Sequence, residues 1–255
     1  MKLHYKELGT GEPLLILHGL FGSSDNWRTL GKKFAEKFRV VFVDLPNHGR
    51  SPHTEDFNYT SMVEDLKELA DDLKLDSFRI IGHSMGGKAA IAFAAKYPEK
   101  VRQMVVVDIS HKQYEHHHDH ILEGLHALNL TPLSSRAEAE KELTKYVGAF
   151  DVRQLLLKNL YWETPGKLGW RMNIPVISRE LGRIIEEIPV VILQTETLFL
   201  RGGKSAYVPD TDLKEMKEKF PNSRIATISE AGHWIHSEAP EEFYSVVMDF
   251  FNEVS

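Results

Sequence analysis

The sequence predicts an α/β fold with a mostly parallel central sheet and helices on both of its faces. Short apolar runs alternate with stretches of helical periodicity over residues 1–109, and the alternation returns over residues 189–255. Most of these apolar runs are continuous, as expected for strands buried on both faces. The chain has 255 residues, 42% hydrophobic and 27% charged, which is enough for one large core.

The first half of the chain has the clearest alternation of strand and helix. Residues 3–8 alternate apolar and polar side chains, which suits an edge or hairpin strand. Residues 14–17 form a buried strand, and a helix with Ser24 or Asp25 as its N-cap follows. Further strands are expected at 39–43, 78–81 and 103–107, and further helices at 61–73 and 88–96.

The pattern changes between residues 110 and 188, where no strand-like run occurs. Helices are expected at 119–129, 135–147 and 151–160, and one or two more between 173 and 186. We therefore expect residues 110–188 to form a helical lid, or cap, inserted into a core domain of residues 1–109 and 189–255.

The last part of the chain restores the α/β pattern and completes the core domain. Strands are expected at 197–200 and 224–228, and helices at 212–220 and 240–251. A loop over residues 229–236 follows the last strand and contains His233 and His236.

Composition and charge exclude several classes of function. The net charge of −6 gives no electrostatic attraction for nucleic acid or an anionic membrane. The chain has no cysteine, so it has no disulfides, thiolate metal sites or cysteine nucleophile. Residues 1–7 contain no apolar signal segment, and no apolar run approaches the roughly 20 residues that span a bilayer. We expect a cytoplasmic protein, and no oligomeric state is indicated.

A cluster of histidines at residues 116–120 invites a metal-site hypothesis. His116 and His120 have the i, i+4 spacing with which two imidazoles on a helix can chelate a metal. No carboxylate or further ligand is fixed around them, so a solvated helix start is the favoured interpretation. We expect neither a metal nor a cofactor.

The motif Gly82-His83-Ser84-Met85-Gly86 stands between a predicted strand and a predicted helix. In such a tight turn the serine hydroxyl is lifted above the sheet edge, and the residues two positions away on each side must be small. This context predicts that Ser84 is a nucleophile. The alternative is a glycine-rich turn with an incidental serine.

Further motifs occur in a fixed order along the core. They are His18-Gly19, Asp44 with Gly49-Arg50-Ser51, Gly82–Gly87, and Ala231-Gly232-His233. On these residues the chain resembles the α/β-hydrolase fold everywhere except in the lid. Within this fold it more closely resembles the bacterial YbfF-type esterases and the related ABHD11 group. The matching features are His18–Ser23, Asn47–Ser51, Gly82–Lys88, Asp108 and Gly202–Val208.

The resemblance implies which residues accompany Ser84. His233 follows the last strand, where this fold delivers its general base, and His236 is its nearest rival. His18 and His83 occupy motif positions that imply structural roles.

Many members of the fold place the acid in the loop after the next-to-last strand. Here that stretch carries Ser205, whereas Asp210 and Asp212 look like turn and helix-cap residues. YbfF-type esterases take the acid from the earlier strand, so the resemblance implies Asp108 as the acid. It also implies Ser205 as an auxiliary hydrogen-bonding partner, with a plain loop residue as the alternative.

The oxyanion hole and the substrate pocket follow from the same resemblance. The backbone N–H groups of Met85 and Leu20 are the expected donors, with Phe21 as the fallback for Leu20. Side chains expected to line the substrate pocket are Phe21, Trp162, Tyr207 and Trp234. The lid aromatics Phe150, Tyr161, Trp162 and Trp170 could line this pocket or simply pack the lid onto the core.

The predicted function is hydrolysis of a carboxylic ester, or an acyl thioester, with a small or medium acyl group. The reaction would pass through an acyl-enzyme on Ser84, and it should slow in acid as its histidine base protonates. Alternatives with the same three residues are C–C bond hydrolysis, lactone opening and cofactor-free haloperoxidation. A non-catalytic ligand-binding member of the fold is the remaining alternative.

Overall fold

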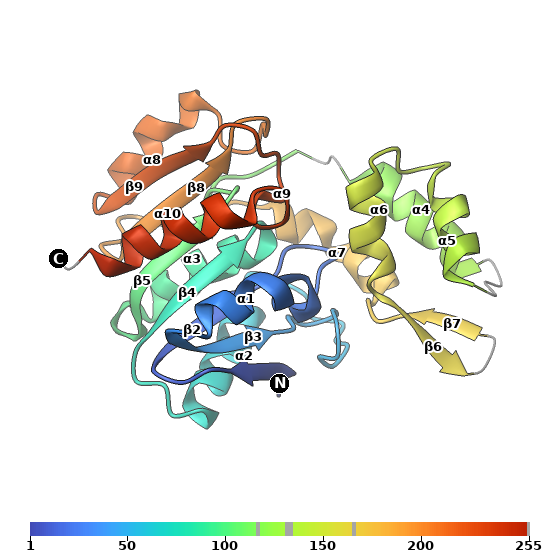
Figure 1. Ribbon diagram of the computed structural model, residues 1–255, viewed down its shortest axis with the longest axis horizontal. Helices are drawn as coiled ribbons and strands as arrows, with labels where there is room; N and C mark the ends of the chain where they lie inside the picture. Colours follow the sequence, from blue (N-terminus) through green and yellow to red (C-terminus); the bar gives the residue numbers. More distant parts are fainter. Residues whose placement is uncertain (116–117, 131–134, 165–166, 254–255) are drawn as a thin grey trace.

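The central sheet has seven strands in the order β1-β3-β2-β4-β5-β8-β9 (Figure 1). The computed structural model describes residues 1–115, 118–130, 135–164 and 167–253. Strand β1 is antiparallel to β3, and every other neighbouring pair is parallel. The strands are β1 (Tyr5–Leu8), β2 (Glu12–Leu17), β3 (Phe38–Val43), β4 (Phe78–His83), β5 (Val101–Val107), β8 (Glu196–Gly202) and β9 (Ser223–Ile228).

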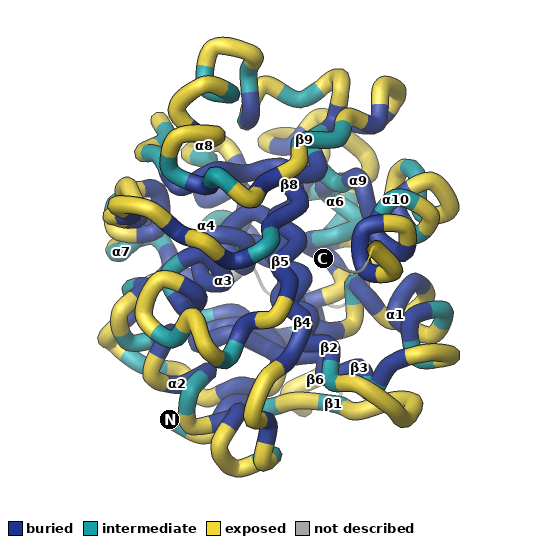
Figure 2. Tube along the Cα trace, turned by 90° about the vertical axis from the view of Figure 1, so that its left-hand side faces the viewer, coloured by how far each residue is buried: buried dark blue, intermediate teal, exposed yellow. Residues whose placement is uncertain are grey.

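Helices cover both faces of this sheet, so its inner strands are buried on two sides (Figures 1 and 2). In β5, Val105 and Val107 pack in the same apolar cluster as Trp27 and Phe243, on the face of α1 (Arg28–Phe34) and α10 (Pro240–Asn252). Neighbouring side chains of β5 point to the other face, because successive residues of a strand alternate. That face carries α2 (Tyr59–Asp72), α3 (Met85–Lys96) and α8 (Leu213–Lys219). The predicted fold class is confirmed.

The ends of several elements differ from the prediction. Strand β2 begins at Glu12, because its backbone pairs with β3 whatever the polarity of the side chain. The N-cap after β2 is Ser23, not Ser24 or Asp25, and its N–H donates to Asn26 Oδ1 at 2.6 Å. Residues 24–27 then form a 3-10 turn before α1. A short helix, α9 (Ile235–Glu238), occupies part of the predicted loop after β9.

Residues 108–195 connect β5 to β8, and we call residues 110–188 of this connection the insert. They contain α4 (Asp119–Leu130), α5 (Arg136–Leu143), α6 (Phe150–Leu157), β6 (Leu160–Thr164), β7 (Lys167–Trp170) and α7 (Ile174–Ile185). The prediction that the insert lacks strands is wrong, because β6 and β7 pair antiparallel. A short run such as residues 160–164 fits either a helix end or a strand, and only pairing with its partner decides between them.

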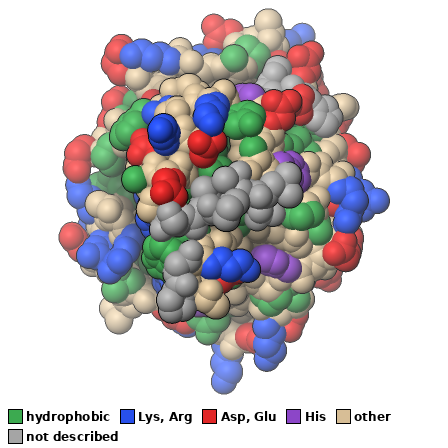
Figure 3. Space-filling view, turned by 90° about the vertical axis from the view of Figure 1, so that its right-hand side faces the viewer, with side chains coloured by type: hydrophobic (Ala, Val, Ile, Leu, Met, Phe, Trp, Pro, Cys, Tyr) green, Lys and Arg blue, Asp and Glu red, His purple; other side chains and the backbone are tan. Residues whose placement is uncertain are grey.

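Figure 3 shows the face of the molecule that carries the insert. Charged side chains of both signs and hydrophobic side chains are interspersed over it (Figure 3).

His116, half of the predicted chelating pair, lies outside the described residues. Among the residues that are described, no group of three or more His, Cys, Asp or Glu side chains could hold a metal ion. Within the same residues, no helix is long and apolar enough to cross a membrane.

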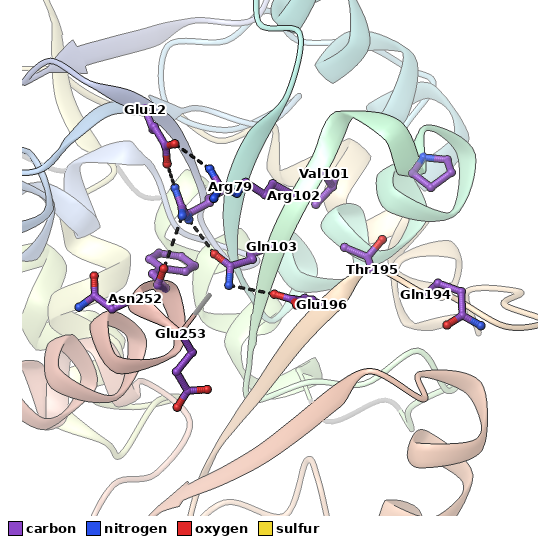
Figure 4. Close-up of a pocket in the computed structure, with 12 residues that line it drawn as sticks. Glu12, Arg79, Val101, Arg102, Gln103, Gln194, Thr195, Glu196, Asn252 and Glu253 are labelled. Atoms are coloured by element: carbon purple, nitrogen blue, oxygen red, sulfur yellow. Dashed lines mark hydrogen bonds and ion pairs between the residues drawn. The ribbon is translucent and has the colours of Figure 1, made fainter. Parts of the chain in front are cut away.

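A cavity of about 640 Å³ lies at the amino ends of β4, β5 and β8 (Figure 4). The guanidinium of buried Arg79 is paired with Glu12 and donates to Gln103 Oε1 at 2.8 Å. Gln103 Nε2 in turn donates to Glu196 Oε2 at 3.1 Å and to Phe250 O at 3.2 Å. These polar groups form hydrogen bonds with one another and with a carbonyl of α10. We therefore interpret the network as structural, because it joins α10 to the sheet. Chemistry in such sheets gathers at the opposite, carboxyl ends of the strands.

A buried lysine marks the junction of the insert with the core. The two connecting segments lie side by side, since Ile188 N–H donates to His111 O at 2.7 Å. Lys88, on α3, points its Nζ at the carbonyls that end α7 and donates to Ile185 O at 3.2 Å and to Glu186 O. A cation is favourable at a helix C-terminus. Burial nevertheless lowers the pKa of Lys88 from 10.5 to about 7.

This lowered pKa predicts a rise of stability with pH. Between about pH 7 and 10 the unfolded chain binds a proton on this lysine that the native protein has lost. The free energy of unfolding should therefore increase with pH over this range, by at most about 1.4 kcal/mol per pH unit from this group. Urea unfolding of the wild type and of Lys88→Met between about pH 7 and 9.5 measures the two slopes. Equal slopes would contradict the prediction.

Candidate active site

Ser84 occupies the turn from β4 into α3 in a backbone conformation that is uncommon for a residue with a side chain. Its φ is 51° and its ψ is −118°. A Cβ on Gly82 would lie 2.2 Å from Gly86 O, and a Cβ on Gly86 would lie 2.6 Å from His18 O. Only glycines therefore fit two positions before and two positions after the serine, where the motif predicts small residues. The hydroxyl is held at the carboxyl end of β4, in the middle of the sheet.

Asp108 directly follows β5, the strand beside β4, and its buried carboxylate accepts three hydrogen bonds. Oδ1 accepts from the Gly202 N–H at 2.9 Å. Oδ2 accepts from His233 Nδ1 at 2.8 Å and from the Ser205 hydroxyl. Because Asp108 has a φ of 50°, the backbone also turns sharply here. Three donors from β8 and the following loops therefore converge on one carboxylate.

The imidazole of His233 is held on several sides. Tyr207 stacks on it with ring centroids 4.0 Å apart and an interplanar angle of 20°. Its own carbonyl accepts from His83 Nε2 at 2.9 Å, so the histidine beside Ser84 holds the backbone of His233. Burial keeps the pKa of His83 well below its usual value, so this ring stays neutral.

The rival residues lie elsewhere. His236 stacks on Trp27 with ring centroids 4.1 Å apart, and burial lowers its pKa to about 3. Asp210 is exposed and pairs with Arg201 at 2.6 Å, and Asp212 pairs with Lys112. The hydrogen-bonded pair at the end of the sheet is thus His233 with Asp108.

The predicted oxyanion donors are the N–H of Met85, which directly follows Ser84, and the N–H of Leu20, a residue that lines the same cavity as Ser84. Met85 is the first residue of α3, so its N–H has no acceptor within the helix. In the loop after β2, the N–H of Phe21 donates to His48 Nε2 at 3.2 Å. This bond occupies the fallback donor and favours Leu20 as the second one.

A cavity of about 220 Å³ opens above Ser84. Of the residues predicted to line the substrate pocket, Phe21, Tyr207 and Trp234 line it, together with Leu20, Ser84 and His233. Trp162 does not line it, because strand β6 leaves this side chain half exposed on the insert. Phe150, Tyr161 and Trp170 are not among the lining residues either.

Residues of the insert form one wall of this cavity, and they were not predicted as lining residues from the sequence. The lining residues that it contributes are His118, His120, Ile121, Val152, Leu155 and Leu156. Most of these lie on α4 and α6, and the hydroxyl of Tyr207 lies 3.4 Å from His118 Nε2. His118 and His120 belong to the histidine cluster considered above as a metal site, whereas no motif distinguishes Ile121, Val152, Leu155 and Leu156 from other apolar helix residues. Only the packing of the insert on the core places these residues at the cavity.

Several known proteins are similar to this chain over most of its length. The family model described as "alpha/beta hydrolase fold" matches residues 12–240. The mouse protein named sn-1-specific diacylglycerol lipase ABHD11 is 37% identical over 93% of this chain and 80% of its own length. Esterase YbfF of Escherichia coli K12 is 32% identical over 94% of this chain and 93% of its own length. A solved structure of a marine microorganism esterase superposes with a TM-score of 0.94 at 38% identity, covering 98% of this chain and 99% of that one.

Proposed function

This chain belongs to the α/β-hydrolase family as a carboxylic ester hydrolase, and from that premise we propose how it acts and on what. Ser84 is the nucleophile, His233 the general base and Asp108 the acid. The substrate is an ester, or a thioester, with a small or medium acyl chain. The proposal rests above all on the 2.8 Å hydrogen bond between His233 and Asp108, beside a cavity that Ser84 and His233 both line.

Acylation begins when the Ser84 hydroxyl attacks the carbonyl carbon while His233 takes its proton through Nε2. The imidazolium that forms is stabilised by Asp108, whose carboxylate also fixes the tautomer with the proton on Nδ1. The N–H groups of Leu20 and Met85 stabilise the negative oxygen of the tetrahedral intermediate. His233 then gives its proton to the departing alcohol or thiol.

Deacylation repeats these steps with water. His233 accepts a proton from a water molecule, whose oxygen attacks the acyl carbon of the Ser84 ester. Collapse of the second tetrahedral intermediate releases the carboxylic acid and returns the proton to Ser84. Ser205 acts on Asp108 rather than on the substrate, because its hydroxyl donates to the oxygen that also binds His233.

The size of the cavity supports a limited acyl chain. Its volume of about 220 Å³ lies below the roughly 300–1,000 Å³ of pockets that hold drug-sized ligands. Its walls are mainly apolar, with Ile121, Val152, Leu155 and Leu156 from the insert. Such walls favour an acyl chain, and each methylene that fits adds to binding.

An acyl-length series tests this proposal. For p-nitrophenyl esters from acetate to palmitate, kcat/KM should peak among the short and medium chains and fall by about tenfold or more for palmitate. The same series of acyl-CoA thioesters, measured in parallel, separates esterase from thioesterase action. A maximum at palmitate would contradict the proposed acyl size. Failure to hydrolyse any ester in a Ser84-dependent way would contradict the mechanism.

A further inference from the structure

The loop that carries the Leu20 N–H contains a turn whose backbone conformation is unfavourable by itself. Gly22 N–H donates to Gly19 O at 3.0 Å, which closes a four-residue turn with Leu20 and Phe21 at its centre. Phe21 is the third residue of this turn and has a φ of 61°. A positive φ at the third position of a turn is normally adopted by glycine. A residue with a side chain in this region costs on the order of 1–2 kcal/mol. Contacts outside the turn must compensate for that cost.

His48 holds one side of Phe21. Its Nδ1 faces Pro46 O at 2.9 Å, and because a carbonyl only accepts, this nitrogen carries the proton. Nε2 is then the acceptor for the Phe21 N–H at 3.2 Å. Burial, with a smaller effect from His18, lowers the pKa of His48 to about 3, so the ring stays a neutral acceptor at working pH.

Asn159 holds the other side, and it comes from the insert. Its Nδ2 donates to Phe21 O at 2.7 Å, across 138 residues of sequence. The same nitrogen lies 3.3 Å from Leu156 O and 3.5 Å from Leu155 O, so three carbonyls fix the orientation of the amide. Asn159 is buried, and its backbone carbonyl accepts from Arg171 N–H at 2.9 Å. The side chain is therefore held between the carbonyls at the end of α6 and Phe21 O, and the backbone of Asn159 is fixed by Arg171.

We propose that Asn159 is a positioning residue that holds the Phe21 turn in the conformation that presents the Leu20 N–H to the oxyanion. This inference rests on the proposed function. Both peptide groups of Phe21 are held, one by the core through His48 and one by the insert through Asn159. Through this bond the seating of the insert on the core controls the oxyanion hole as well as the acyl pocket.

The variant Asn159→Leu tests the role, because leucine has nearly the shape of asparagine and lacks the donor. Asn159 Oδ1 has no hydrogen-bond partner among the described residues, so the substitution removes only the Nδ2 bonds. We expect kcat for p-nitrophenyl butyrate to fall by about 10- to 100-fold, with KM within about twofold of wild type. A trifluoromethyl ketone accepts the Ser84 oxygen at its carbonyl carbon and forms a hemiketal whose oxyanion lies in the hole, so its inhibition constant should rise by a similar factor.

Tyr59→Phe is the matched control. Its hydroxyl donates to Ile184 O at 2.8 Å, so it is another buried bond between the core and the insert, away from the Phe21 turn. We expect its kcat to change by less than about twofold. An equal loss in both variants, or a wild-type kcat in folded Asn159→Leu, overturns the inference. Should Asn159→Leu fail to fold, Asn159→Ala with the same two readouts decides it.

The outcome also separates this inference from the proposed function. Wild-type hydrolysis that persists in Ser84→Ala would overturn the function and the inference together. Ser84-dependent hydrolysis with a raised KM but an unchanged kcat in Asn159→Leu would overturn only the inference, because it would place Asn159 in substrate binding.

Discussion

Replacing Ser84 with alanine is expected to lower kcat for ester hydrolysis by about 10⁵- to 10⁶-fold. The substitution removes the atom that forms the acyl-enzyme and leaves the rest of the site in place. The rate that remains reflects the acceleration over the uncatalysed reaction that the oxyanion hole and substrate binding still provide. The measurement is kcat with p-nitrophenyl butyrate, together with mass spectrometry of the protein after exposure to a fluorophosphonate probe.

The wild type should gain one probe adduct, on Ser84, and Ser84→Ala should gain none. Ser110→Ala is the matched control, because Ser110 is also buried but bonds to Tyr114 rather than lining the cavity. It should label and turn over like the wild type. An adduct on folded Ser84→Ala, or a kcat within tenfold of wild type, would show that another group is the nucleophile.

The second large effect concerns the acid, because the family more often takes it from a later loop. Asp108→Asn should lower kcat by about 10³- to 10⁴-fold. The carboxylate accepts from Gly202 N–H through one oxygen and from His233 and Ser205 through the other. An asparagine has only one oxygen, so its amide group must oppose a donor on one side. If the amide faces His233, the ring adopts the tautomer with its proton on Nε2 and cannot accept one from Ser84.

Variants at Asp210, Asp212 and Ser205 make the prediction for Asp108 specific. Asp210→Asn and Asp212→Asn should stay within about twofold of wild type, because their carboxylates pair with Arg201 and Lys112 instead. Ser205→Ala should give an intermediate loss, since it removes one of the three hydrogen bonds to Asp108. Near-wild-type turnover in folded Asp108→Asn, with a large loss in Asp210→Asn, would move the acid to the later loop.

Much of the fold was predictable because it depends on local patterns. Continuous apolar runs gave the strands of the sheet, and the spacing of glycines around Ser84 gave the turn. The hairpin β6–β7 was missed because residues 160–170 are too short for their periodicity to distinguish a strand from a helix end. For the same reason Trp162 was expected in the pocket, whereas the hairpin leaves it half exposed.

The candidate site likewise combines residues that were predicted from the sequence with contacts that only the structure reveals. The strand-to-helix context of its motif predicted Ser84, and the resemblance to the YbfF-type esterases implied His233 as the base and Asp108 as the acid. The tertiary structure alone shows which N–H of the loop after β2 is already bonded, which insert residues line the cavity above Ser84, and that Asn159 reaches Phe21. Those contacts join residues far apart in the chain across two packed surfaces. Their existence depends on how the insert sits on the core, which no local pattern in the sequence encodes.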